Sequence, residues 1–116
     1  MHLILDCSEC PREKLTDLEL IYSFLDTFPP KIKMTKIATP QIVRYMAKKH
    51  IDWGISGFIL IAESHISIHT FPERGSFNLD IFSCKPFDIK KTIAYIKEHF
   101  QPKRIKTSLH AKRLAL

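Results

Sequence analysis

Three runs rich in β-branched and aromatic residues follow one another through the middle of the chain, and they constrain its fold more than any other feature. They span residues 55–62, 65–71 and 76–84 and are separated by two and four residues. Runs of this length and composition predict strands, and gaps this short are typical of hairpin turns. The middle of the chain is therefore expected to form three consecutive strands of one antiparallel sheet.

Two other segments have the periodicity of amphipathic helices. In the first, Thr16 and Glu19 have the spacing of a capping box, and Pro29-Pro30 predicts where the helix ends. The second is expected to begin after Asp88, which is a favoured N-cap residue type, and to end before Pro102. The apolar positions are Leu15, Leu18, Ile21, Leu25 and Phe28 in the first helix, and Ile89, Ile93, Ile96 and Phe100 in the second.

Further strands are predicted at residues 2–7 and 105–109, and less regular ones at 34–38 and 42–46, divided by Pro40. Strands outnumber helices, and two amphipathic helices can cover one face of an antiparallel sheet. We therefore predict an α+β fold, a two-layer sandwich of mainly antiparallel sheet with two helices packed on one face. A chain of 116 residues has the size of a single domain, expected here to span residues 1–116.

The four-residue turn at residues 72–75 sets how two of the strands pair. If residue 71 lies opposite residue 76, one face of the pair is apolar and suits the helices, whereas the other face is polar. The apolar pairs are Ile66–Ile81 and Ile68–Leu79, and the polar-face pairs are His65–Phe82, Ser67–Asp80 and His69–Asn78. The same register brings Cys84 beside Glu63 and Ser64.

A tight turn centred on Glu63 and Ser64 is expected between the first two of these strands. The pairs it predicts are Ala62–His65, Phe58–His69 and Ser56–Phe71. Ser56 and His69 then share the polar face, where histidine, serine, asparagine and aspartate mix with aromatic residues. Such a mixture suits a ligand or partner surface, although an ordinary solvent-exposed strand face is the alternative.

Composition argues against several classes of protein. The chain is 45% hydrophobic with regular periodicity, unlike a disordered chain. The longest apolar run falls far short of the roughly 20 residues that span a bilayer, and no secretory signal is visible, so no membrane partner is expected. Cys7, Cys10 and Cys84 fit neither a disulfide framework nor a complete zinc site. We therefore expect a cytoplasmic, reduced protein that needs no metal.

The net charge of +6, from 18 Lys and Arg against 12 Asp and Glu, does not by itself predict nucleic-acid binding. The basic residues near the C-terminus lack the interleaved aromatic residues that would stack on bases, so a solvated surface is favoured. They are Lys103, Arg104, Lys106, Lys112 and Arg113.

Three spaced motifs carry a more specific signal. They are Gly-Ile-Ser-Gly at 54–57, Ile-Ala-Glu-Ser-His-Ile-Ser-Ile-His-Thr at 61–70, and Asp-Ile-Phe-Ser-Cys at 80–84. Together they resemble the S-adenosylmethionine decarboxylase proenzyme family in its short prokaryotic form. The resemblance implies that the chain cuts its own backbone between Glu63 and Ser64, leaving a β chain of residues 1–63 and an α chain of residues 64–116.

The resemblance also implies roles for single residues. Ser64 would become a covalent pyruvoyl group that holds the substrate as a Schiff base. His69 would be the base in processing, assisted by Ser56, and Cys84 would return a proton to the substrate after carbon dioxide leaves. The implied activity is decarboxylation of S-adenosylmethionine, a small molecule, in the biosynthesis of spermidine.

Strand geometry adds a constraint of its own. His69 follows Ser64 by five residues, which is about 16 Å in an extended strand, so it should not reach the Ser64 of its own chain. We infer that Ser56 and His69 act on Ser64 of a second subunit in a two-fold homodimer, and the resemblance implies the same composite site. His65 and Ser67 also lie on the polar face, where we expect them to have structural roles.

Two alternatives remain at this point. The segment before residue 54 is basic, and Tyr45 and Trp53 are its only aromatic residues for stacking on adenine. This composition leaves room for a decarboxylase of arginine or ornithine on the same scaffold. The other alternative is a noncatalytic α+β binding module in which Ser64 is merely a turn residue.

Overall fold

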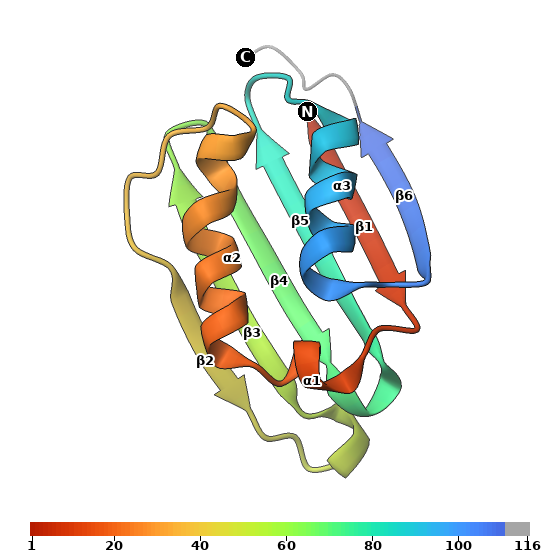
Figure 1. Ribbon diagram of the computed structural model, residues 1–116. Coiled ribbons are helices and arrows are strands. Elements are labelled where there is room, and N and C mark those ends of the chain that lie inside the picture. The colour runs from red at the N-terminus through yellow and green to blue at the C-terminus, as the bar shows by residue number, and fades with distance from the viewer. Residues whose placement is uncertain (111–116) are drawn as a thin grey trace.

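A six-stranded antiparallel sheet with two long helices on one face is the framework of the molecule (Figure 1). The computed structural model describes residues 1–110, so Lys112 and Arg113 of the basic C-terminal group lie outside the described residues. The elements in chain order are β1 (His2–Ser8), α1 (Arg12–Leu15), α2 (Leu18–Lys31), β2 (Gln41–Tyr45), η1 (His50–Asp52), β3 (Gly54–Ile61), β4 (Ser64–Phe71), η2 (Pro72–Arg74), β5 (Ser76–Ser83), α3 (Ile89–Phe100) and β6 (Arg104–His110). The predicted α+β two-layer sandwich is confirmed.

The strands lie in the order β2-β3-β4-β5-β1-β6, so β1, the first strand of the chain, lies between β5 and β6, the last two. β1 pairs with β5 from His2 opposite Phe82 to Cys7 opposite Phe77. The α-amino group of Met1 donates a hydrogen bond of 2.6 Å to the Ser83 carbonyl. The chain's N-terminus therefore lies beside the end of β5, at the same end of the sheet as the β3–β4 turn (Figure 1).

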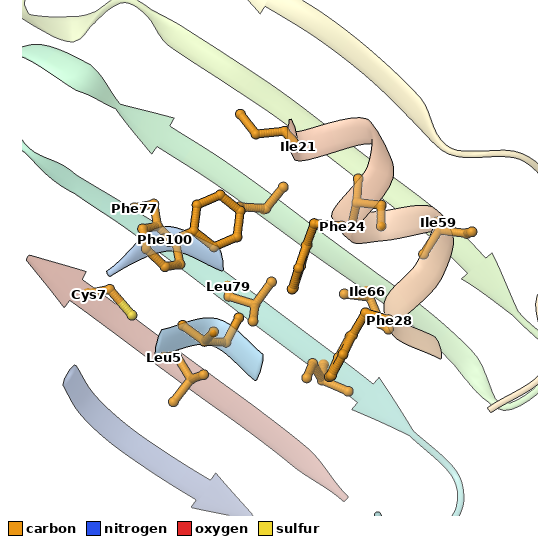
Figure 2. Packing of buried hydrophobic residues seen from close by; sticks show 14 of the residues in the cluster. Leu5, Cys7, Ile21, Phe24, Phe28, Ile59, Ile66, Phe77, Leu79 and Phe100 are labelled. Atoms are coloured by element: carbon orange, nitrogen blue, oxygen red, sulfur yellow. The ribbon is translucent and has the colours of Figure 1, made fainter. Parts of the chain in front are cut away.

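The helices bury one side of the sheet, which we call the covered face. Rings from α2 and α3 meet above β5: the Phe24 centroid lies 5.2 Å from Phe28 and 5.1 Å from Phe100, and Phe100 lies 4.8 Å from Phe77 (Figure 2). Each fully buried side chain of this size contributes about 1.5–3 kcal/mol. The strand residues of the covered face include Leu3, Leu5, Cys7, Ile55, Ile59, Ile66, Ile68, Thr70, Phe77, Leu79 and Ile81.

Two glycines of the first motif permit close approach. A Cβ at Gly57 would lie 2.9 Å from Leu25 Cδ1, so glycine lets α2 pack tightly on β3. A Cβ at Gly54 would lie 1.8 Å from the Thr70 carbonyl oxygen, which is fixed backbone. The motif glycines thus have a packing reason that is independent of any chemistry.

The first helix differs from its prediction at both ends. Asp17 is the N-cap, and its Oδ1 accepts the Leu20 N–H at 3.1 Å, so the predicted Thr16 capping box is wrong. The helix runs through Pro29 and Pro30 to Lys31. Each proline fits the φ of a helix but has no N–H to donate to the carbonyl four residues earlier, and the helix ends one residue after Pro30. The predicted second helix is confirmed, with Asp88 accepting the Lys91 N–H at 3.0 Å.

Six of the seven predicted strands are present, with bounds that differ by a few residues at most, and one is absent. Residues 34–38 form no strand and contribute a single bridge, between Lys36 and Ile61. The register across the 72–75 turn is confirmed from Phe71–Ser76 to His65–Phe82. Gly75 supplies the left-handed conformation that this turn requires, with φ 63°.

Candidate active site

The turn between β3 and β4 consists of Ala62 and Glu63, with Ile61 opposite Ser64. The predicted register is therefore wrong by two residues: His65 faces Leu60, and His69 faces Ser56. Backbone bonds outside the hairpin hold the turn, since the Ala62 N–H donates to the Thr35 carbonyl at 2.8 Å. A shift of two residues keeps every side chain on its face, so Ser56 and His69 share the polar side as predicted.

The Glu63 side chain is anchored from both sides. Its Oε1 accepts the Thr35 N–H at 3.1 Å, and its Oε2 lies 3.3 Å from Lys85 Nζ. The Thr35 hydrogen bond first, and then Lys85, hold the pKa of Glu63 below its ordinary value. These contacts restrain the side chain of the residue directly before Ser64.

The carbonyl of Glu63 accepts a hydrogen bond of 3.0 Å from the Cys84 N–H. This confirms the predicted position of Cys84 beside Glu63. A backbone N–H aimed at a carbonyl oxygen stabilises the negative charge that develops there when a nucleophile attacks the carbonyl carbon. The next residue is Ser64, whose φ of 157° is positive but close to the extended region. A donor, a carbonyl and a hydroxyl are thus assembled around one peptide bond.

His65 contacts the hydroxyl of Ser64, which the sequence did not indicate. Its Nδ1 lies 3.2 Å from Ser64 Oγ, and its ring stacks on Phe82 at 5.5 Å with planes 3° apart. The structural role expected for His65 accounts for the stacking on Phe82 but not for the contact with Ser64. The signal that could have found it is its position directly after Ser64 and opposite Phe82 in the register.

Ser56 and His69 form a second polar pair on the face away from the helices, which we call the open face. Ser56 Oγ lies 2.8 Å from His69 Nδ1. The pair borders a cavity of about 410 Å³, which is lined by Gln41, Ile42, Val43, Ser56, Gly57, Phe58, Ser67 and His69. Because Ser64 and His69 are five residues apart on β4, about 16 Å, the two groups do not meet within one chain.

Comparison with known proteins decides the family. A family model described as S-adenosylmethionine decarboxylase matches residues 1–113. The chain belongs to this family. It is 37% identical over 114 residues to an S-adenosylmethionine decarboxylase proenzyme of Clostridium botulinum, covering 96% of this chain and 93% of that protein. It is 33% identical over 102 residues to one of Archaeoglobus fulgidus, covering 87% and 86%.

A solved structure agrees with this assignment. The adenosylmethionine decarboxylase of Aquifex aeolicus superposes with a TM-score of 0.80 at 28% identity, over 99% of this chain and 91% of that one. Membership of the S-adenosylmethionine decarboxylase family confirms both the resemblance inferred from the motifs and the enzyme class, a carboxy-lyase. The noncatalytic binding module is therefore not favoured.

The two aromatic residues of the basic segment are placed differently in this decarboxylase. Trp53 is buried, donates from Nε1 to Glu73 Oε1 at 3.1 Å, and lies under the Arg44 guanidinium at 5.0 Å. Tyr45 is exposed on the edge strand β2. Trp53 thus helps to hold residues 46–53, the segment between β2 and β3, in place. Phe58 is the phenylalanine that lines the open-face cavity.

The side chains able to bind a metal do not cluster in the described part of this decarboxylase. Residues 1–110 contain no group of three or more His, Cys, Asp or Glu side chains placed to hold a metal ion. Cys7, Cys10 and Cys84 are all free thiols, and only Cys84 is exposed. No helix among the described residues is long and apolar enough to cross a membrane.

Proposed function

We propose that this chain is a proenzyme that cleaves itself between Glu63 and Ser64 and then decarboxylates S-adenosylmethionine in polyamine biosynthesis. The single domain of residues 1–116 would become a β chain, 1–63, and an α chain, 64–116. The observation that carries the proposal is the 3.0 Å hydrogen bond from the Cys84 N–H to the Glu63 carbonyl, directly before the Ser64 hydroxyl. Relatives named S-adenosylmethionine decarboxylase proenzyme support the substrate and the processing.

Serine at position 64 suits the cleavage because its Oγ can serve first as nucleophile and then as leaving group. Oγ attacks the Glu63 carbonyl carbon, the Cys84 N–H stabilises the oxyanion, and the peptide bond is exchanged for an ester. Loss of the Ser64 Cα proton then breaks the Cβ–Oγ bond. This releases the α-carboxylate of Glu63 as the end of the β chain and leaves a dehydroalanine at position 64. Addition of water and release of ammonia then give the N-terminal ketone of the α chain.

His69 is the base proposed for the loss of the Cα proton, with Ser56 orienting it through the 2.8 Å hydrogen bond to Nδ1. Since His69 is too far from Ser64 of its own chain, a second copy must supply it. The open face carries exposed apolar side chains that a second copy would cover in a homodimer. They include Val43, Tyr45, Phe58 and Leu60.

Mixing variants tests the shared site. In a dimer of one S64A chain and one H69A chain, His69 of the first can serve Ser64 of the second. We expect neither homodimer to complete cleavage, and the coexpressed pair to yield cleaved H69A chain. Absence of any cleavage in the mixture, with dimers present by light scattering, would contradict a site shared between subunits.

The residues around position 64 fit a covalent pyruvoyl group, because the new N-terminus of the α chain would lie beside the exposed Cys84 at the end of the sheet. Such a group supplies the electron sink for the pair of electrons left when carbon dioxide departs. Cys84 is the proposed donor of the proton that replaces the carboxylate on the substrate carbon. In the homodimer, the open-face cavity beside His69 of one subunit is proposed to hold the small-molecule substrate against residue 64 of the other. Neither nucleic acid nor a membrane is a proposed partner.

Mass spectrometry of the purified protein tests the proposal directly. We expect two chains, residues 1–63 and 64–116, and an α chain that reacts with hydroxylamine and borohydride. The S64A variant should remain one intact chain. A single intact wild-type chain without a reactive ketone would refute it. Offering S-adenosylmethionine, arginine and ornithine to the processed enzyme then decides the substrate, with S-adenosylmethionine expected to react. Three free thiols suit the proposed cytoplasmic location.

A further inference from the structure

We propose that His65 is the base that activates Ser64 for the first step of self-cleavage, acting within the same chain. The inference rests on the proposed function and assigns one of its steps to a residue outside the Ser56–His69 pair. His65 Nδ1 lies 3.2 Å from Ser64 Oγ, within reach of the proton that must leave when Oγ attacks. The Cys84 N–H already holds the carbonyl that Oγ would attack.

The His65 ring is held in position for this contact. It stacks on Phe82 of β5 at 5.5 Å with planes 3° apart, and Leu60 of β3 lies opposite it on the other side. Its hydrogen bond to Ser64 is the one side-chain hydrogen bond found for this ring within residues 1–110. A ring fixed by stacking and aimed at a single hydroxyl loses little orientational freedom at the moment of reaction.

His69 cannot take this role in its own chain. It lies five residues further along β4, about 16 Å away, and its Nδ1 is engaged by Ser56 Oγ at 2.8 Å. The two histidines of β4 therefore divide the processing reaction. His65 serves the exchange of peptide for ester in its own chain, and His69 serves the later elimination in the partner subunit.

The proposed step is balanced without any further reactant. As Ser64 Oγ forms its bond to the Glu63 carbonyl carbon, the Oγ proton passes to His65 Nδ1, and the carbonyl electron pair moves onto the oxygen held by Cys84. When the oxyanion collapses, the bond between that carbon and the Ser64 nitrogen breaks. The nitrogen takes the proton from His65 Nδ1, which leaves an ester, a free amine and neutral imidazole.

Hydroxylamine distinguishes the two steps, because it cuts an ester between residues 63 and 64 but leaves the amide intact. We expect H69A to accumulate the ester and to be cut by hydroxylamine. H65A and H65F should remain as the amide, uncut, with cleavage slowed at least about 100-fold, the usual minimum for loss of a general base. Added imidazole should restore cleavage to H65A. H65F keeps a ring against Phe82, so its loss of cleavage would come from the missing nitrogen.

His2→Ala is the matched control, since His2 also contacts the Phe82 ring, at 4.7 Å, but has no contact with Ser64. H2A should cleave at the wild-type rate. The assignment to His65 is overturned if H65F cleaves within about threefold of wild type, if H65A accumulates the ester, or if H2A is slowed as much as H65A. A wild-type chain that never cleaves would instead refute the proposed function itself.

Discussion

The covered and open faces of one sheet differ in how they use the same strands. On β4, Ile66, Ile68 and Thr70 are buried under the helices, whereas Ser67 and His69 alternate with them on the open face. Strand alternation thus lets a chain of 116 residues give one side to its core and the other to the Ser56–His69 pair. The Ser56–His69 pair uses no side chain of the hydrophobic core, so substitutions on the two faces should have separable effects on processing and on stability.

The largest expected difference between the two faces is in the free energy of unfolding after one phenylalanine on each face is truncated. Phe24 is fully buried among Phe28, Tyr95 and Phe100, and F24A should lower the free energy of unfolding by about 3–5 kcal/mol. Phe58 is 42% exposed on the open face, and F58A should cost less than about 1 kcal/mol. Urea denaturation on the S64A background, where the chain stays whole, measures both.

Equal losses in F24A and F58A would show that the open face is as much a part of the core as the covered face. Repeating the F58A measurement at two protein concentrations separates monomer stability from dimer formation, because only the latter depends on concentration.

The thiols give the next contrast. Burial raises the pKa of Cys7 to about 12 and that of Cys10 to about 11, whereas Cys84 is exposed. Since the thiolate is the reactive form, iodoacetamide at pH 8 should alkylate Cys84 at least about 100-fold faster than either buried thiol. Peptide mass spectrometry over time checks the rates. Comparable labelling of Cys7 in native protein would contradict the packing of β1 under the helices.

The two hairpins show why the sequence predicted some of this arrangement and missed the rest. The 72–75 turn ends in Gly75, which adopts the left-handed conformation that residues with side chains disfavour, so the register there could be deduced. Ala62 and Glu63 carry no such mark. Their position depends on Thr35, 27 residues upstream of Ala62 in the sequence, whose carbonyl bonds the Ala62 N–H, and the register was misplaced by two residues.

Contacts between distant segments account for the other gaps in the prediction. The insertion of β1 between β5 and β6 follows from pairings across most of the chain, which strand periodicity does not encode. For the candidate site, spacing placed Ser56 and His69 on one face, although not opposite each other, and placed Cys84 beside Glu63. The His65–Ser64 contact depends instead on side-chain orientation at the start of β4, which alternation does not specify.

The smallest expected difference between the faces is in the stability lost when one of two hydroxyl groups on β4 is removed. Thr70 is buried on the covered face, where its Oγ1 donates to the Leu15 carbonyl at 2.9 Å and accepts the Ile55 N–H at 3.0 Å. T70V keeps the shape but leaves that carbonyl and that N–H without a partner, so it should cost about 1–3 kcal/mol. Ser67 lies two strand positions from His65 on the open face, and S67A should change stability by less than about 0.5 kcal/mol.

Urea midpoints for T70V and S67A on the S64A background test this contrast, with T70S as the control that keeps the hydroxyl. T70S should retain both hydrogen bonds and lose only a methyl group, so most of the T70V loss should be absent. If T70S is as unstable as T70V, packing of the methyl group and not the hydroxyl holds this position. The covered face would then be stabilised by apolar contact alone, without a polar link between β4, β3 and α1.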